Sequence, residues 1–273
     1  MDSTNTNINM EELNYRQKAI SWLLHSLKII FGDESIRRYI IVFYNPTITN
    51  SGKKFIRTFD AFVEPGKTRE DKAQEITSYC KNVLKKKGIT VFTATNIQQN
   101  KFDHETHFQS YIVDNTTKKI IVIDPAYDNT KDGCAGIYMA EVSNEVVIPF
   151  FTNNGYDVQF ICLSSPAQIC ESDVFCQSWS LYILLQKLKN NEYLTNVSLD
   201  IPIDQLDKYD MILQFYKQIF TDMPELGDNL RAEYEGEILD TRGPTKPTKI
   251  EKEAFLQLDP VEMLMELTKY EMN

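Results

Sequence analysis

Cys176, His107 and Asp124 are the residue types from which a thiol-based catalytic site can be built. Asp124 follows His107 at the end of the next strand-like run, and Cys176 opens an apolar segment after an acid-rich stretch. A carboxylate can fix the tautomer of an imidazole and stabilise its protonated form. A histidine held in this way can take a proton from a thiol, and the resulting thiolate attacks carbonyl carbons. These residue types therefore predict nucleophilic catalysis by a cysteine.

A predicted β-hairpin brings the histidine and the acid together. Residues 107–113 and 119–124 are rich in β-branched and aromatic residues, and a polar turn at 114–117 separates them. In an antiparallel pair the start of the first strand lies beside the end of the second. We therefore expect His107 and Asp124 to be neighbours, and we expect Asp114 to be a turn residue.

The cysteine is expected at the start of a buried helix. Residues 175–188 are helical in length and apolar on nearly every side, which is typical of a helix in the centre of a domain. Cys176 would lie in the first turn, where the positive end of the helix dipole favours a thiolate. Such a helix would hold the nucleophile rigidly.

Periodicity and turn signals predict the remaining elements. Apolar residues at helical spacing indicate helices, and short β-branched or aromatic runs indicate strands. The expected helices cover residues 10–31, 69–87 and 204–220 and a segment that opens at 259–260, and the expected strands cover 39–44, 89–94 and 157–163. The mixture indicates an α+β fold.

The order and spacing of these residues resemble the papain-like cysteine proteases of the Ulp/SENP and adenovirus protease clan (clan CE), in particular its divergent members in large DNA viruses. In that family the histidine begins a strand, and the acid follows at the end of the next strand, at about the spacing that separates Asp124 from His107. The resemblance covers roughly residues 100–190. It implies an α+β fold of the Ulp/adenain type, in which a central helix carrying Cys176 packs on a mixed β-sheet. An N-terminal helical extension and an acidic C-terminal tail would flank this core.

The resemblance also assigns an oxyanion donor. The family has a glutamine a few residues before its cysteine, and its side-chain amide acts together with the backbone N–H of the cysteine. By position this residue is Gln168, with Gln177 as the alternative. The sequence departs from the family pattern at Phe108, where a tryptophan is usual, and in its Asp-Val-Phe-Cys-Gln sequence, where Asp-Cys-Gly is usual. The separation between Gln168 and Cys176 is also slightly longer than the family's usual one.

What the resemblance implies about function is a thiol-dependent peptidase or isopeptidase, which cleaves a polyprotein or a ubiquitin-like conjugate and needs no cofactor. The expected partner is a protein or peptide substrate, with ubiquitin-like proteins among the candidates. Two alternatives stay open: a catalytically degenerate protease fold with a structural or virion role, and an acyltransferase of the same fold.

Other residues compete for the base and the acid. His104 lies shortly before His107, and Asp128 follows Asp124 in Tyr-Asp-Asn, a sequence similar to the Tyr-Asp-Ser of some family members. A different interpretation of the site is a zinc centre. Zinc sites favour closely spaced pairs of cysteines. The candidate ligands are spaced more widely than such pairs, so they fit poorly; they are Cys162, Cys170 and Cys176 with His104 or His107.

Composition restricts the function further. The chain of 273 residues carries 29 Lys and Arg against 39 Asp and Glu, a formal charge of −10. Residues 222–273 hold 13 acidic and 6 basic residues, so most of the imbalance lies there. Such a chain gains little from phosphate contacts, and we expect no nucleic-acid partner. Motifs for dinucleotide binding, a P-loop, a serine nucleophile elbow and a zinc protease helix are lacking.

The cysteine count and the apolar runs suggest a location. The number of cysteines is odd, which favours free thiols over a disulfide framework, and no uninterrupted apolar run approaches the length of a membrane-spanning helix. We expect an intracellular protein without a membrane partner, in the host cytoplasm or the virion if it is viral. The expected organisation is an N-terminal extension over 1–66, a catalytic core over 67–221, and an acidic linker with a final helix over 222–273.

Overall fold

The computed structural model describes the chain in segments: residues 10–27, 58–60, 69–99, 104–126, 143–168, 175–189, 198–229, 231–232, 254 and 257–272. The chain forms two compact units. One comprises residues 30–201 and contains the predicted site, and the other combines residues 1–29 with 202–273.

A mixed sheet forms the centre of the unit made by residues 30–201. Its strands β2 (Ile89–Gln99), β3 (His104–Asp114) and β4 (Lys119–Ile123) pair antiparallel, β2 with β3 and β3 with β4. The short β1 (Thr58–Asp60) pairs parallel with β2, and β5 (Asp157–Phe160) pairs parallel with β4. The strand order is therefore β1-β2-β3-β4-β5. This topology confirms the predicted hairpin and its polar turn.

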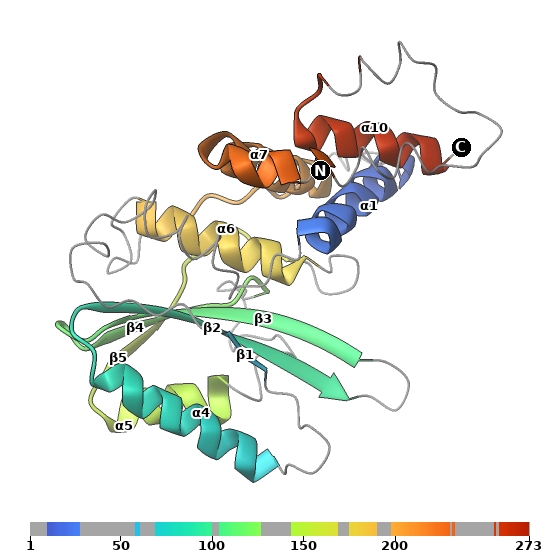
Figure 1. Cartoon of the computed structure of the whole chain (residues 1–273). Coiled ribbons are helices and arrows are strands. Elements are labelled where there is room, and N and C mark those ends of the chain that lie inside the picture. Colours follow the sequence, from blue (N-terminus) through green and yellow to red (C-terminus); the bar gives the residue numbers. More distant parts are fainter. Residues whose placement is uncertain are drawn as a thin grey trace, which may run out of the picture. The chain divides into compact units, whose positions relative to one another are not determined.

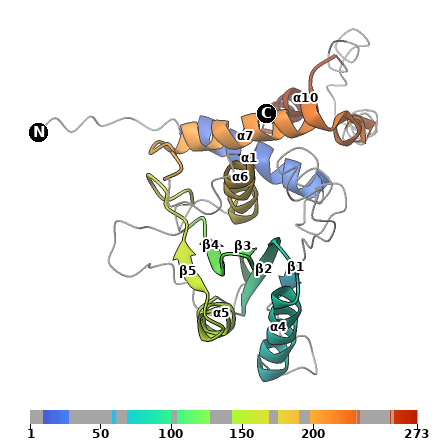
Figure 2. The ribbon, with the colours of Figure 1, turned by 90° about the vertical axis from the view of Figure 1, so that its left-hand side faces the viewer.

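Helices cover both faces of this sheet. Helix α6 (Cys176–Lys189) lies on one face, while α4 (Arg69–Leu84) and α5 (Ile148–Asn153) lie on the other (Figures 1 and 2). A π-helical turn, η3 (Ser143–Val147), leads into α5. The α+β class and the packing of the cysteine-bearing helix on a mixed sheet are thus as expected. Most of α6 is buried, as its all-round apolar sequence predicts.

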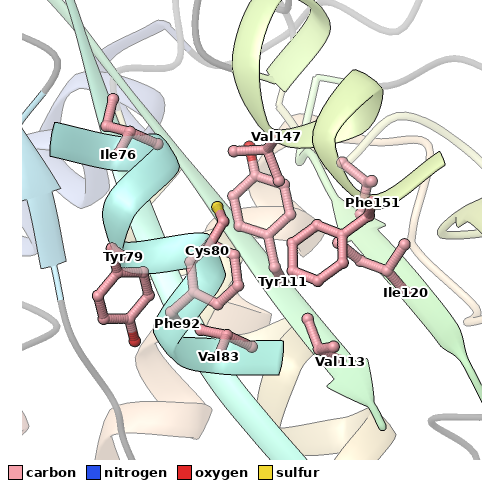
Figure 3. Packing of buried hydrophobic residues seen from close by; sticks show 11 residues of the cluster. Ile76, Tyr79, Cys80, Val83, Phe92, Tyr111, Val113, Ile120, Val147 and Phe151 are labelled. Atoms are coloured by element: carbon pink, nitrogen blue, oxygen red, sulfur yellow. The ribbon is translucent and has the colours of Figure 1, made fainter. Parts of the chain in front are cut away.

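A hydrophobic core joins the sheet to α4 and α5. Figure 3 shows Cys80 of α4 and Phe151 of α5 facing the side chains of the central strands. The rings of Phe92 and Tyr111 stack with their centroids 4.7 Å apart, and both residues are fully buried. Burial of large aromatic side chains provides a major part of the stability of such a layer.

A residue of the turn between β3 and β4 forms hydrogen bonds with the end of α4. Gly88 adopts a φ of 72°, a left-handed conformation that suits glycine at a helix C-terminus. The side-chain amide of Asn115 donates to the carbonyl oxygens of Val83 and Lys86, at 2.9 and 2.8 Å. The Val83 carbonyl also accepts from the backbone N–H of Lys86 at 3.0 Å, so the Asn115 amide reinforces the last turn of the helix.

The second unit is helical in its described residues and contains α1 (Met10–Leu27), α7 (Gln205–Asp222) and α10 (Pro260–Met272). Residues 224–229 form a further short helical stretch. The Tyr15 hydroxyl of α1 donates to the carbonyl oxygen of Met265 in α10 at 2.7 Å. Lys217 of α7 forms ion pairs with Glu262 at 2.9 Å and with Asp259 at 3.1 Å. Asp204 caps α7 by accepting from the backbone N–H groups of Leu206 and Asp207.

The structure differs from the sequence-based expectations at several places. Strand β2 runs to Gln99, beyond its predicted end at 94, while β5 ends at Phe160, before its predicted end at 163. The short elements β1, η3 and α5 were not expected. The predicted strand at 39–44 lies outside the described residues, and the division at 66 and 221 stays a prediction. None of the helices in the described segments is long and apolar enough to cross a membrane.

Candidate active site

His107 and Asp124 form a buried hydrogen-bonded pair. The Nε2 atom of His107 lies 2.8 Å from Oδ1 of Asp124, and the two side chains are 4% and 0% exposed. The hairpin produces this contact because β3 and β4 pair Ser110 with Ile123, so the start of β3 runs past the residues that follow β4. The predicted proximity of the two residues is therefore observed.

The Asp124 carboxylate accepts two further hydrogen bonds. The backbone N–H of Ala126 donates to Oδ1 at 2.9 Å, and the Nε2 amide of Gln109 donates to Oδ2 at 2.6 Å. Burial alone would raise the pKa of Asp124, but the charge of His107 and these hydrogen bonds lower it below its ordinary value. The carboxylate is therefore ionised although it is fully buried.

Cys176 contacts the same imidazole. The His107 side chain shares a hydrogen bond with Cys176, and since Nε2 is engaged with Asp124, Nδ1 is the nitrogen available to the sulfur. Burial acts to lower the pKa of His107, but Asp124 and the hydrogen bonds outweigh it and raise the pKa to about 10. The ring is thus protonated at neutral pH.

Helix α6 positions the sulfur. Cys176 is its first residue and is 3% exposed. One helical turn later, the hydroxyl of Ser180 donates to the carbonyl oxygen of Phe108 at 3.0 Å. Residues four apart lie on the same side of a helix. This bond therefore fixes α6 against β3 next to His107, and it explains how two residues far apart in the sequence come together.

The two glutamines are placed differently. The backbone N–H of Gln168 donates to the carbonyl oxygen of Pro125 at 2.8 Å, so Gln168 lies beside the segment that carries Asp124. Gln177 follows the cysteine directly in α6. Its amide nitrogen is buried and has no hydrogen-bond partner among the described residues. Neither observation shows which side-chain amide would bind an oxyanion, so both assignments stay predictions.

Other expectations have mixed outcomes. Asp114 is a turn residue as expected, because its carboxylate accepts from the backbone N–H of Thr116 and the hydroxyl of Thr117. His104 begins β3, but its side chain lies outside the described residues, as do Asp128 and Cys170. Within the described segments no group of His, Cys, Asp or Glu side chains could hold a metal ion. The zinc interpretation stays untested because Cys170 and His104 belong to it.

Gln109 contacts the candidate acid and was not predicted from the sequence. The signal was present in the predicted hairpin, because alternate residues of a strand share a face and Gln109 is two positions after His107. The register then places it opposite Asp124. A glutamine inside an apolar strand, across from a candidate acid, therefore predicts a hydrogen bond to that acid.

Comparisons with known proteins give only distant similarities. No protein-family model and no curated protein sequence matches this chain significantly. Among solved structures, the Chlamydia trachomatis effector protein ChlaDUB1 is similar over 83% of this chain and 97% of its own, with 13% identity and a TM-score of 0.43. The Legionella pneumophila effector protein RavZ, in complex with human LC3B, is similar over 79% of this chain, with 11% identity and a TM-score of 0.35. This chain covers 63% of that RavZ chain.

Proposed function

We propose that this protein is a thiol-dependent peptidase or isopeptidase, with Cys176 as nucleophile, His107 as base and Asp124 as orienting acid. One observation carries the proposal: a continuous series of hydrogen bonds joins the sulfur of Cys176, the imidazole of His107 and the ionised carboxylate of Asp124. A merely structural cysteine does not require a buried imidazole that is held by a buried carboxylate.

The reaction follows from this arrangement. The Cys176 thiolate attacks the carbonyl carbon of the scissile bond while His107 holds the proton. His107 then donates this proton to the departing amine, and a thioester to Cys176 remains. Water attacks the thioester with His107 as base, the carbon–sulfur bond breaks, and the carboxylic acid leaves. Asp124 keeps its negative charge and stabilises the imidazolium throughout.

The oxyanion needs hydrogen-bond donors near the sulfur. The backbone N–H of Cys176 is one proposed donor, because the first N–H groups of a helix have no partner within the helix. The side chain of Gln168 is the second, and Gln177 is the alternative, supported by its buried amide nitrogen without a partner in the described part of the chain.

The two glutamines can be separated by two reactions of the same thiol. Alkylation by iodoacetamide involves no oxyanion, whereas hydrolysis of a C-terminal fluorogenic amide of ubiquitin does. Loss of the true donor lowers hydrolysis by about 10²–10³-fold and leaves alkylation unchanged. We expect this result for Gln168→Ala and not for Gln177→Ala. The reverse pattern would assign the role to Gln177.

The proposed substrate is a protein, cleaved at a peptide or an isopeptide bond. A polyprotein and a conjugate of a ubiquitin-like protein are the two candidates, and both present an amide carbonyl to the thiolate. No cofactor takes part in the proposed reaction, because the nucleophile and the proton carrier are both side chains of this chain.

Mass spectrometry of the intact protein tests the proposal. The full chain is treated briefly near neutral pH with iodoacetamide, and separately with ubiquitin and ubiquitin-like proteins that carry a C-terminal propargyl amide. We expect an adduct on Cys176 that forms faster than any on Cys162, a half-buried cysteine. His107→Ala should remove this preference, and a propargyl amide that reacts would indicate the substrate.

Cys162→Ser is the matched control, since it removes a thiol outside the proposed site and should leave labelling of Cys176 intact. If Cys176 reacts no faster than Cys162, or if His107→Ala has no effect, the proposed enzyme is wrong. The degenerate fold with a structural role would then be favoured.

A further inference from the structure

We propose that Gln109 is a positioning residue of this site: its amide, held in one orientation by Tyr111, locks the Asp124 carboxylate toward His107. The inference rests on the proposed function and adds a layer behind the three catalytic side chains.

Gln109 is placed for this role by the strand itself. His107, Gln109 and Tyr111 occupy alternate positions of β3 and so share one face. Gln109 is fully buried, and its Nε2 donates to Oδ2 of Asp124 at 2.6 Å. This is the shortest of the described hydrogen bonds to that carboxylate. A charge-assisted bond of this length is among the stronger ones in proteins.

With the bond from Gln109, both oxygens of the Asp124 carboxylate accept hydrogen bonds. Oδ1 accepts from His107 and from the backbone of Ala126, while Oδ2 accepts from Gln109. With a donor on each oxygen, the carboxylate resists rotation about its own axis. Its Oδ1 then stays in line with Nε2 of His107, which leaves Nδ1 for the sulfur.

Tyr111 decides which end of the Gln109 amide faces the acid. Its hydroxyl donates to Oε1 of Gln109 at 3.2 Å, so the oxygen points toward Tyr111 and the nitrogen toward Asp124. An inverted amide would place its oxygen against a buried carboxylate, which is repulsive. Tyr111 itself is fixed because it is fully buried and its ring stacks on Phe92.

Among the described residues, a small set of charged and titratable groups acts on the acid and the base. Asp124 and Cys176 act on His107, and His107 acts on Asp124. The phenol of Tyr111 joins them through Gln109. Removing the Gln109 donor raises the pKa of Asp124, because a hydrogen bond to a carboxylate stabilises its charged form. In such a variant the Asp124 carboxylate therefore loses its negative charge at a higher pH than in the parent protein.

The test measures the alkylation rate of Cys176 by iodoacetamide from about pH 3 to pH 8, so that the scan reaches the range in which the Asp124 carboxylate is protonated. The adduct position is read by mass spectrometry. Gln109→Met keeps the length of the side chain and removes both polar atoms. For Gln109→Met we expect the alkylation rate at the lowest pH values to fall about three- to tenfold. The acidic limb, which is the part of the profile where the rate drops with falling pH, should move to higher pH by about half a unit to one unit. Gln109→Glu sets a second carboxylate against Asp124, and the two must share a proton, so the limb should shift further.

Ser110→Ala is the matched control. Ser110 is also fully buried in β3, it points to the other face, and its hydroxyl has no hydrogen-bond partner among the described residues. We expect its pH profile to match the parent. If Gln109→Met proves too unstable to measure, Tyr111→Phe decides, because it removes only the hydroxyl that orients the amide. A smaller shift in the same direction is then expected.

The outcomes separate the two proposals. If Cys176 of the parent reacts no faster than Cys162, the proposed function fails, whatever Gln109 does. If Cys176 is selectively reactive and depends on His107, but Gln109→Met and Tyr111→Phe leave the acidic limb in place, the role of Gln109 is refuted and the proposed function stands. A loss of thermal stability without a shifted limb would likewise reduce Gln109 to a packing residue.

Discussion

The two units of this protein contain ion pairs of different kinds. The His107–Asp124 pair lies in the sheet unit, with side chains 4% and 0% exposed. Lys217 pairs with Asp259 and Glu262 in the helical unit, where the side chains are 30%, 39% and 48% exposed. The N–O distances are similar in both, so geometry alone does not distinguish them.

Burial and additional partners make the difference. Taking a carboxylate out of water is costly, and Asp124 is compensated by three hydrogen bonds as well as by the charge of His107. The Lys217 pairs remain in contact with water, which screens them and limits their value. A buried pair that needs this much support is costly to maintain for stability alone, and its contact with a cysteine fits the proposed catalytic role.

The largest effect is expected from breaking the buried pair on its acidic side. Asp124→Asn replaces an acceptor by a group that carries its own donors, which conflict with the donors of His107 or Gln109. We expect the alkylation rate of Cys176 at neutral pH to fall about tenfold or more. The free energy of unfolding in urea should fall by roughly 3–5 kcal/mol. An unchanged alkylation rate would show that Asp124 does not support the base.

A second effect follows from pH. The pKa of His107 is raised from 6.5 to about 10, so the folded state holds a proton that the unfolded chain has released in this range. The stabilisation is complete below about pH 6.5 and is lost as the pH rises toward 10. We therefore expect the free energy of unfolding to fall between these values in the parent. Urea titrations of His107→Gln over the same range should show a flatter dependence, and equal slopes would contradict the pair.

The smallest effect is expected in the helical unit. Lys217→Met removes both exposed ion pairs and keeps the apolar stem of the side chain. We expect a loss below about 1 kcal/mol that shrinks further in high salt, and no change in the reactivity of Cys176. Thermal unfolding at low and high salt measures this. A loss as large as that of Asp124→Asn would remove the distinction between the two pairs.

Local patterns were sufficient for the acid–base half of the site. The alternation and the polar turn of residues 107–124 indicate a hairpin, and a hairpin of that length brings its two ends together. The pairing of His107 with Asp124 is therefore a consequence of short-range sequence. Gln109 followed from the same register, and it was missed because a buried glutamine was not expected to serve a neighbouring acid.

Other features could not be predicted from local patterns. The short elements β1, η3 and α5 have few residues and weak periodicity, and the partners that stabilise them are distant in the sequence. The sequence of α10 predicts an acidic amphipathic helix. It does not predict that α1 and α7 belong to the same unit as α10.

The amino-acid sequence is enough to name the candidate catalytic groups: a cysteine at a helix start, a histidine and an acid in the two strands of a hairpin, and few alternatives to them. The meeting of the cysteine with the histidine is instead a property of the folded chain. That contact depends on α6 packing against β3 through apolar burial and the bond from Ser180 to Phe108. Packing between distant segments is governed by shape and burial across the whole fold, and these are properties that no local pattern encodes.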